Sequence, residues 1–182
     1  MKIATIIRSI NRTLNEIEEN IFISTTINET LHRYIDFEIG HIQSVLPTRQ
    51  YHAHFFKNNN INKTYLIDLL LEAHDAMSFY YNSIEDILKI QDAFGLSSNT
   101  WFRQVKLDLQ HKVICPYRNV LNIYSAQWPI ITEINRIKFS PQQYRNTPSI
   151  LHDVRSIVIV RLLRQWVTVM HSVIINIERK FR

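Results

Sequence analysis

Residues 148–182 read PSILHDVRSIVIVRLLRQWVTVMHSVIINIERKFR. After its first position the stretch contains neither proline nor glycine. Thr147-Pro148 is a favourable helix entry, because threonine can cap free amides and proline at the first helical position loses no hydrogen bond. Arg179 and Lys180 lie where cations favour the carbonyl end of the helix dipole. The sequence therefore predicts one long helix from residue 148 to the end of the chain.

At 100° per residue, most apolar side chains of this helix fall on one broad arc. The arc contains Ile159, Leu162, Leu163, Trp166, Val167, Val169, Met170, Val173, Ile174 and Ile177. The opposite face carries Arg161, Arg164 and His171, and no acidic residue occurs between Asp153 and Glu178. The apolar coverage exceeds what a surface helix needs, so we expect this helix to be a structural axis of the fold.

The rest of the chain shows the same helical character. Two glycines and five prolines in 182 residues argue against a turn-rich β-sandwich or barrel. We predict an all-α, single-domain bundle of about five to seven helices covering 1–182. The predicted helices before the last one are 2–22, 26–46, 65–94, 99–115, 117–127 and 129–136. The remaining segments, 51–63 and 139–146, are predicted to be a loop and a linker.

Local signals mark several of these boundaries. Thr26-Ile27-Asn28-Glu29 fits a capping box that would start the second helix. Gly95 is a plausible left-handed cap for the third helix, and Ser97 or Ser98 would cap the fourth. Pro116 should kink or break the helix that it interrupts.

Charge divides the predicted domain into three parts. The net charge is +1 for 1–64, the first two helices and the loop, −5 for 65–97, the acidic third helix, and +9 for the basic half 98–182. In the third helix Asp68, Glu72, Asp75, Asn82 and Asp86 share one face. We expect this stripe to face solvent or to pair with arginines of the fourth or last helix.

A membrane span is the alternative interpretation of residues 156–177. Arg161 and Arg164 near its middle would each cost about 2.5 to 3.5 kcal/mol on insertion, against gains of about 0.3 to 0.6 kcal/mol per Leu, Ile or Val. The first seven residues are followed at once by Arg8 and Arg12 and do not have the form of a signal peptide. We expect a cytoplasmic protein with no membrane partner.

Cations alternate with aromatic residues in the basic half, for example from Trp101 through Arg118 to Tyr124. Such a surface attracts phosphate backbones, and accessible aromatic rings can stack on unpaired bases. We expect a helical module that binds RNA or single-stranded DNA within a larger assembly. The candidate binding residues are Arg103, Lys106, Arg118, Arg161 and Arg164. A non-catalytic protein-interaction subunit, including a homo-oligomer, would use the same surface and remains an alternative.

Arg164 and His171 lie two helical turns apart, with six residues between them. This spacing resembles the Arg-x4-6-His motif of the HEPN ribonucleases, small helical bundles that cleave RNA without a metal. The resemblance implies that His171 would act as general acid or base and that Arg164 would stabilise the phosphoryl oxyanion. That motif more often reads Arg-Asn, which occurs here as Arg118-Asn119, but Ile123 then occupies the histidine position.

Metal and cofactor sites have weaker sequence support. Glu72-Ala73-His74-Asp75 and Glu16-Ile17-Glu18-Glu19 resemble the paired acidic motifs with which MazG-type pyrophosphohydrolases hold magnesium, but at a longer separation. His52-Ala53-His54 is the one close histidine pair, and zinc needs three or four converging ligands. The single Cys115 excludes an internal disulfide, and two glycines do not make a phosphate-cradling loop. We expect neither metal nor cofactor.

Overall fold

The computed structural model of the chain describes residues 3–24, 29–58, 61–89, 96–125, 135–138 and 148–180. These residues form helices and no strand, which confirms the predicted all-α bundle with a long C-terminal helix. The α-helices are α1 (Ile3–Ser24), α2 (Glu29–Ile42), α3 (Gln50–His54), α4 (Lys63–Leu88), α5 (Leu96–Asp108), α6 (Cys115–Tyr124) and α7 (Pro148–Lys180). Two short 3-10 turns, η1 (Gln43–Val45) and η2 (Phe55–Lys57), and a π-helical segment, η3 (Leu109–Ile114), complete the order.

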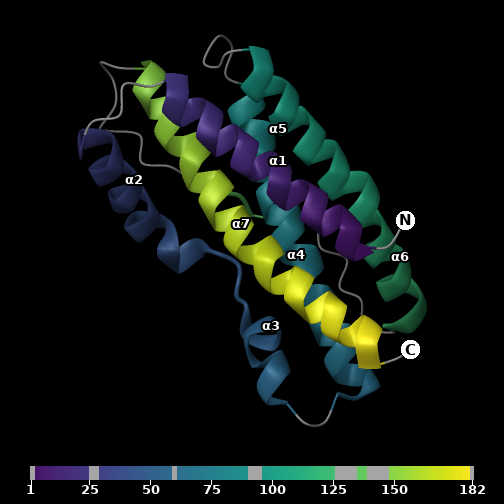
Figure 1. Cartoon of the computed structure of the whole chain (residues 1–182). Coiled ribbons are helices and arrows are strands. Elements are labelled where there is room, and N and C mark those ends of the chain that lie inside the picture. The colour runs from purple at the N-terminus through teal and green to yellow at the C-terminus, as the bar shows by residue number, and fades with distance from the viewer. Residues whose placement is uncertain are drawn as a thin grey trace.

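Helix α7 is the axis of the bundle. It contacts α1, α2, α3 and α4, and its most extensive contact is with α1. Figure 1 shows α1 and α7 side by side and running in opposite directions, so that the start of α1 and the end of α7 lie at the same end of the bundle. The four consecutive residues from Ile157 to Val160 are all fully buried, which means that other parts of the chain surround α7 on every side there.

By length and composition, α7 is also the one helix in the described part of the chain that could cross a membrane. Of its most apolar 18-residue window, 61% is buried inside the fold. The core helix of a soluble protein meets the same criteria.

Helix α3 corrects the prediction of a loop over 51–63. The carboxylate of Glu72 in α4 accepts hydrogen bonds from the backbone amides of Tyr51 (3.1 Å) and His52 (2.9 Å) at the start of α3. Both amides lack a partner within so short a helix, and an acceptor at this end stabilises it. Because this acceptor lies twenty residues away in sequence, no local pattern indicated the helix.

The segment from α5 to α6 corrects the predicted cap of the fourth helix and shows how the chain passes Pro116. Helix α5 begins at Leu96, so Ser97 and Ser98 lie inside it and are not its caps. Pro116 does not end the helical path, because the preceding turns widen into η3, where the Cys115 amide donates to the Gln110 carbonyl. A π-helical turn accommodates the missing proline amide while the chain stays helical from α5 through α6.

The other predicted boundaries have mixed outcomes. Helix α4 is capped by Asn62, whose side chain accepts from the Tyr65 amide at 2.9 Å. The predicted helix 129–136 is wrong at its end, since residues 135–138 are not helical. The capping box at 26–28, the Gly95 cap, the Thr147 cap and the linker 139–146 lie outside the described residues.

Candidate functional site

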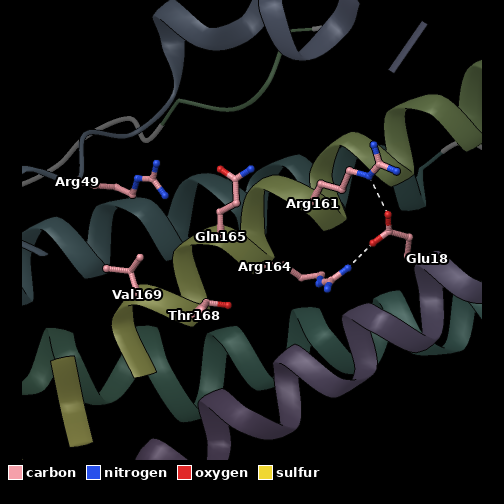
Figure 2. A pocket seen from close by; sticks show the side chains of 7 residues that line it. All are labelled: Glu18, Arg49, Arg161, Arg164, Gln165, Thr168 and Val169. Atoms are coloured by element: carbon pink, nitrogen blue, oxygen red, sulfur yellow. Dashed lines mark hydrogen bonds and ion pairs between the residues drawn. The ribbon is translucent and has the colours of Figure 1, made fainter. Parts of the chain in front are cut away.

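The two central arginines of α7 converge on one carboxylate of α1. Arg161 Nε donates to Glu18 Oε1 at 2.7 Å, and Arg164 Nη1 donates to Glu18 Oε2. Figure 2 shows both side chains pointing toward Glu18, which is only 12% exposed. The guanidinium of Arg161 also lies over the ring of Phe22, 5.6 Å from its centroid. The expected partners of these arginines, the carboxylates of the third helix, are therefore not the observed ones.

A surface cleft of about 550 Å³ lies beside this ion pair. Its walls are formed by Glu18, Arg49, Arg161, Arg164, Gln165, Thr168 and Val169, which we call the α7 cleft. Arg49 enters from the segment before α3 and forms no ion pair with any described residue. Three guanidinium groups and a single carboxylate thus line the α7 cleft, which leaves it with an excess of positive charge.

The clamping of α3 explains why Arg49 lies there. Besides the two backbone amides, Glu72 bonds His52 Nδ1 at 2.7 Å, and the Tyr65 hydroxyl donates to the Tyr51 carbonyl at 2.7 Å. The His52 ring packs edge-on against Trp166 of α7, with centroids 5.2 Å apart. Helix α3 is therefore held between α4 and α7, and Arg49 directly precedes it. Sequence reasoning missed Arg49, because only these long-range contacts bring it to the cleft.

His171 lies further along the same flank of α7 as Arg164 and Thr168, but it does not line the α7 cleft. Its Nε2 atom is buried and has no hydrogen-bond partner among the described residues. Helix α1 runs antiparallel to α7, and Glu18 lies opposite Arg161 and Arg164. Asn11 precedes Glu18 by two turns of α1, and His171 follows Arg164 by two turns of α7, so Asn11 and His171 lie at about the same level of the bundle. The Oδ1 atom of Asn11 is likewise buried without a partner.

The other three predicted binding residues lie elsewhere. Arg103 is exposed on α5. Lys106 donates to Glu85 Oε1 at 3.0 Å and lies 4.9 Å from the centroid of the Tyr81 ring. Burial would lower the pKa of Lys106, but the hydrogen bond to Glu85 and the other attractions outweigh it, so this pKa is raised. Arg118 is exposed on α6 and lines a separate small pocket. The structure therefore brings only Arg161 and Arg164 of the five into one cleft.

Acidic side chains of the α4 stripe bond groups other than the arginines of the fourth and last helices that the sequence suggested. Glu72 holds α3, Asp75 bonds His74 Nδ1 at 3.1 Å, and Asp86 accepts two bonds from Arg136, at 2.9 and 3.0 Å. The charge of Asp68 raises the pKa of the Tyr51 hydroxyl, and both residues line a cleft of about 480 Å³ between α4 and the segment before α3.

The described residues contain no group of three or more His, Cys, Asp or Glu side chains that could hold a metal ion. The two histidines of the close pair, His52 and His54, make separate contacts. His52 bonds Glu72, whereas His54 Nδ1 lies 2.8 Å from the Gln50 carbonyl. Neither ring is directed toward a shared ligand by these contacts.

The α7 cleft can bind an anion. Guanidinium groups donate paired hydrogen bonds to phosphate and carboxylate oxygens, and Glu18 already occupies such a position between two of them. Gln165 and Thr168 add exposed polar groups to the rim.

No protein-family model, no curated protein and no solved structure matches the chain.

Proposed function

We propose that the protein binds single-stranded nucleic acid, RNA foremost, by holding backbone phosphate in the α7 cleft. The observation that carries this proposal is the surplus of guanidinium groups: those of Arg49, Arg161 and Arg164 line a cleft of about 550 Å³ whose lining contains one carboxylate, that of Glu18. Phosphate contacts supply most sequence-independent affinity for nucleic acids, and arginine matches phosphate geometry.

The contact with Glu18 supports the proposal geometrically. One carboxylate reaches Arg161 and Arg164 through its two oxygens, so both guanidinium groups can engage a single anionic group at the same time. A backbone phosphate offers two such oxygens. Arg49 approaches from the other side of the α7 cleft, where the next phosphate of an extended strand would lie.

A salt titration tests the proposal. Fluorescence anisotropy with a labelled single-stranded RNA should give an affinity that falls linearly with salt on logarithmic axes, and replacing Arg49, Arg161 or Arg164 with glutamine should each reduce the slope by about 0.7. Arg103→Gln is the matched control, because Arg103 is exposed and outside the α7 cleft. Binding that is absent, independent of salt, or equally affected by the control would refute the proposal.

Metal-independent RNA cleavage is a second candidate function, with Arg164 in the α7 cleft and His171 beside it on the same flank of α7. It is favoured by the position of His171 on the flank of α7 that carries Arg164 and by its unpartnered Nε2. In this reaction Arg164 would stabilise the phosphoryl oxyanion and His171 would transfer a proton. Arg164→Ala and His171→Ala should abolish cleavage of an RNA substrate and leave the circular dichroism spectrum unchanged. Purified wild-type protein that leaves RNA intact would exclude this candidate.

A protein-interaction subunit is favoured by a different surface. On α6 the apolar side chains of Val120, Ile123 and Tyr124 follow each other at helical spacing and are exposed, Ile123 by 73%. Exposed apolar helix faces of this kind often mark protein contacts. Light scattering of the purified protein should show an oligomer that Ile123→Asp dissociates. A monomer at all concentrations, with no partner retained after nuclease treatment, would exclude this candidate.

A further inference from the structure

Two aromatic rings adjoin the α7 cleft at the end where Arg161 pairs with Glu18, which Figure 2 shows to be the end away from Arg49. The Arg161 guanidinium lies 5.6 Å from the centroid of the Phe22 ring of α1. The Phe22 ring in turn stacks on the ring of His32 in α2, with centroids 5.8 Å apart and an interplanar angle of 24°. Phe22 and His32, which we call the stacking platform, are therefore connected to the cleft through one of its cations.

The two rings of the stacking platform differ in burial. Phe22 is partly buried and packs against the hydrophobic core, which supports its ring. His32 is exposed, so its side chain is accessible to a ligand. Helix α2, which carries His32, packs against α7. The platform is thus supported by the core on its inner side and open to solvent on its outer side.

An exposed, supported aromatic ring suits an unpaired base. The bases of single-stranded nucleic acids stack on aromatic side chains, histidine included, and the contact tolerates any base because every base has a π face. The phosphate and the base of one nucleotide are covalently joined. A phosphate held by Arg161 therefore brings a base close to the rings that this arginine adjoins.

We propose that the stacking platform receives one unpaired base of a strand whose backbone phosphate lies in the α7 cleft, and that this base stacks on His32. The inference rests on the phosphate binding proposed above and adds a base contact to it. It gives the protein a preference for single strands, because the bases of a duplex stack on each other and their faces are closed to a side chain.

Two strands of equal length and charge test the platform: an oligomer of deoxythymidine, and a strand without bases that is built from tetrahydrofuran abasic sites. In fluorescence anisotropy, wild type should bind the base-bearing strand about ten-fold more tightly than the abasic strand. His32→Ala should reduce this difference to less than about two-fold, because it removes the outer ring. His32→Phe should retain the difference, because phenylalanine keeps an aromatic face and carries no charge.

His41→Ala is the matched control. His41 is also an exposed histidine of α2 that stacks on a phenylalanine, Phe37, but neither residue lines the α7 cleft. This variant should bind both strands like wild type, and equal losses in His32→Ala and His41→Ala would overturn the platform. Salt-dependent binding of both strands that His32→Ala leaves unchanged would overturn the platform alone. Wild-type protein that binds neither strand would refute the phosphate site and the platform with it.

Discussion

The acidic stripe of α4 and the basic cleft of α7 look alike in sequence, since each is a row of like charges on one helix face. In the structure they differ in how far their charges are satisfied by hydrogen-bond and ion-pair partners inside the fold. Glu72, Asp75 and Asp86 each bond their own donors, respectively in α3, at His74 and at Arg136. In the α7 cleft, Arg161 and Arg164 share Glu18, the one carboxylate that lines the cleft, and Arg49 forms no ion pair with any described residue.

This difference shows when a charged helix face becomes a candidate binding site. A row of charges that is matched one to one inside the fold stabilises the fold and offers little to a ligand. A row that exceeds its internal partners keeps an electrostatic attraction for an external ion. The predictions below challenge each side of this contrast, beginning with the largest expected effect.

Glu72→Ala should have the largest effect on stability. It removes the acceptor of two backbone amides and of the buried His52 ring, so we expect the free energy of unfolding to fall by about 3 kcal/mol. Urea denaturation measures this change. Asp75→Ala is the control, since its side chain is 52% exposed, and it should change stability by less than about 0.5 kcal/mol. Similar losses for the two variants would contradict the clamping role of Glu72.

Glu18→Gln tests whether the excess positive charge of the α7 cleft attracts RNA. Without the competing carboxylate charge, the cleft should bind single-stranded RNA about three- to ten-fold more tightly at low salt. Glutamine keeps the size and one acceptor oxygen of the side chain, so the fold should be retained. The dissociation constant from anisotropy is the measurement, and a weaker affinity than wild type would show that Glu18 supports binding instead of competing with it.

Lys106→Gln tests whether a cation that is paired with a carboxylate inside the fold contributes to RNA binding. The hydrogen bond from Lys106 lowers the pKa of Glu85, but Glu85 is 38% exposed, so the pair should contribute less than about 1 kcal/mol to stability. RNA affinity and its salt slope should stay at wild-type values. A reduced salt slope would place Lys106 in the binding surface and break the distinction between paired and surplus cations.

His152→Gln should have the smallest effect, visible only in the pH dependence of stability. Burial, together with the charge of Arg155, lowers the pKa of His152 from 6.5. The unfolded chain therefore binds this proton more readily, and wild-type stability should fall as the pH drops below about 6.5. In His152→Gln the decrease between pH 7.5 and pH 5.5, measured by urea denaturation, should be smaller. An unchanged decrease would assign the pH dependence to other groups.

Helix positions followed well from sequence where the signal is local. The bounds of α1 and α7 agree with the predicted ones, because apolar periodicity and helix-end signals depend on residues a few positions apart. Helix α3 was missed, because a carboxylate from α4 stabilises it, and the π-helical form of η3 before Pro116 was not predicted. The candidate site was predicted in part: Arg161 and Arg164 line the α7 cleft, whereas Arg49 was not singled out.

The sequence by itself determined the helical class, the long axial helix and the acid-free arginine face of that helix, since these depend on residues a few positions apart. Only the tertiary structure decided which charges are matched. Glu18 and Arg161 are 143 residues apart, and the antiparallel packing of α1 on α7 brings them into contact. Charge pairing depends on which residues are neighbours in space. The excess of guanidinium groups that makes the α7 cleft a candidate site therefore exists only in the assembled bundle.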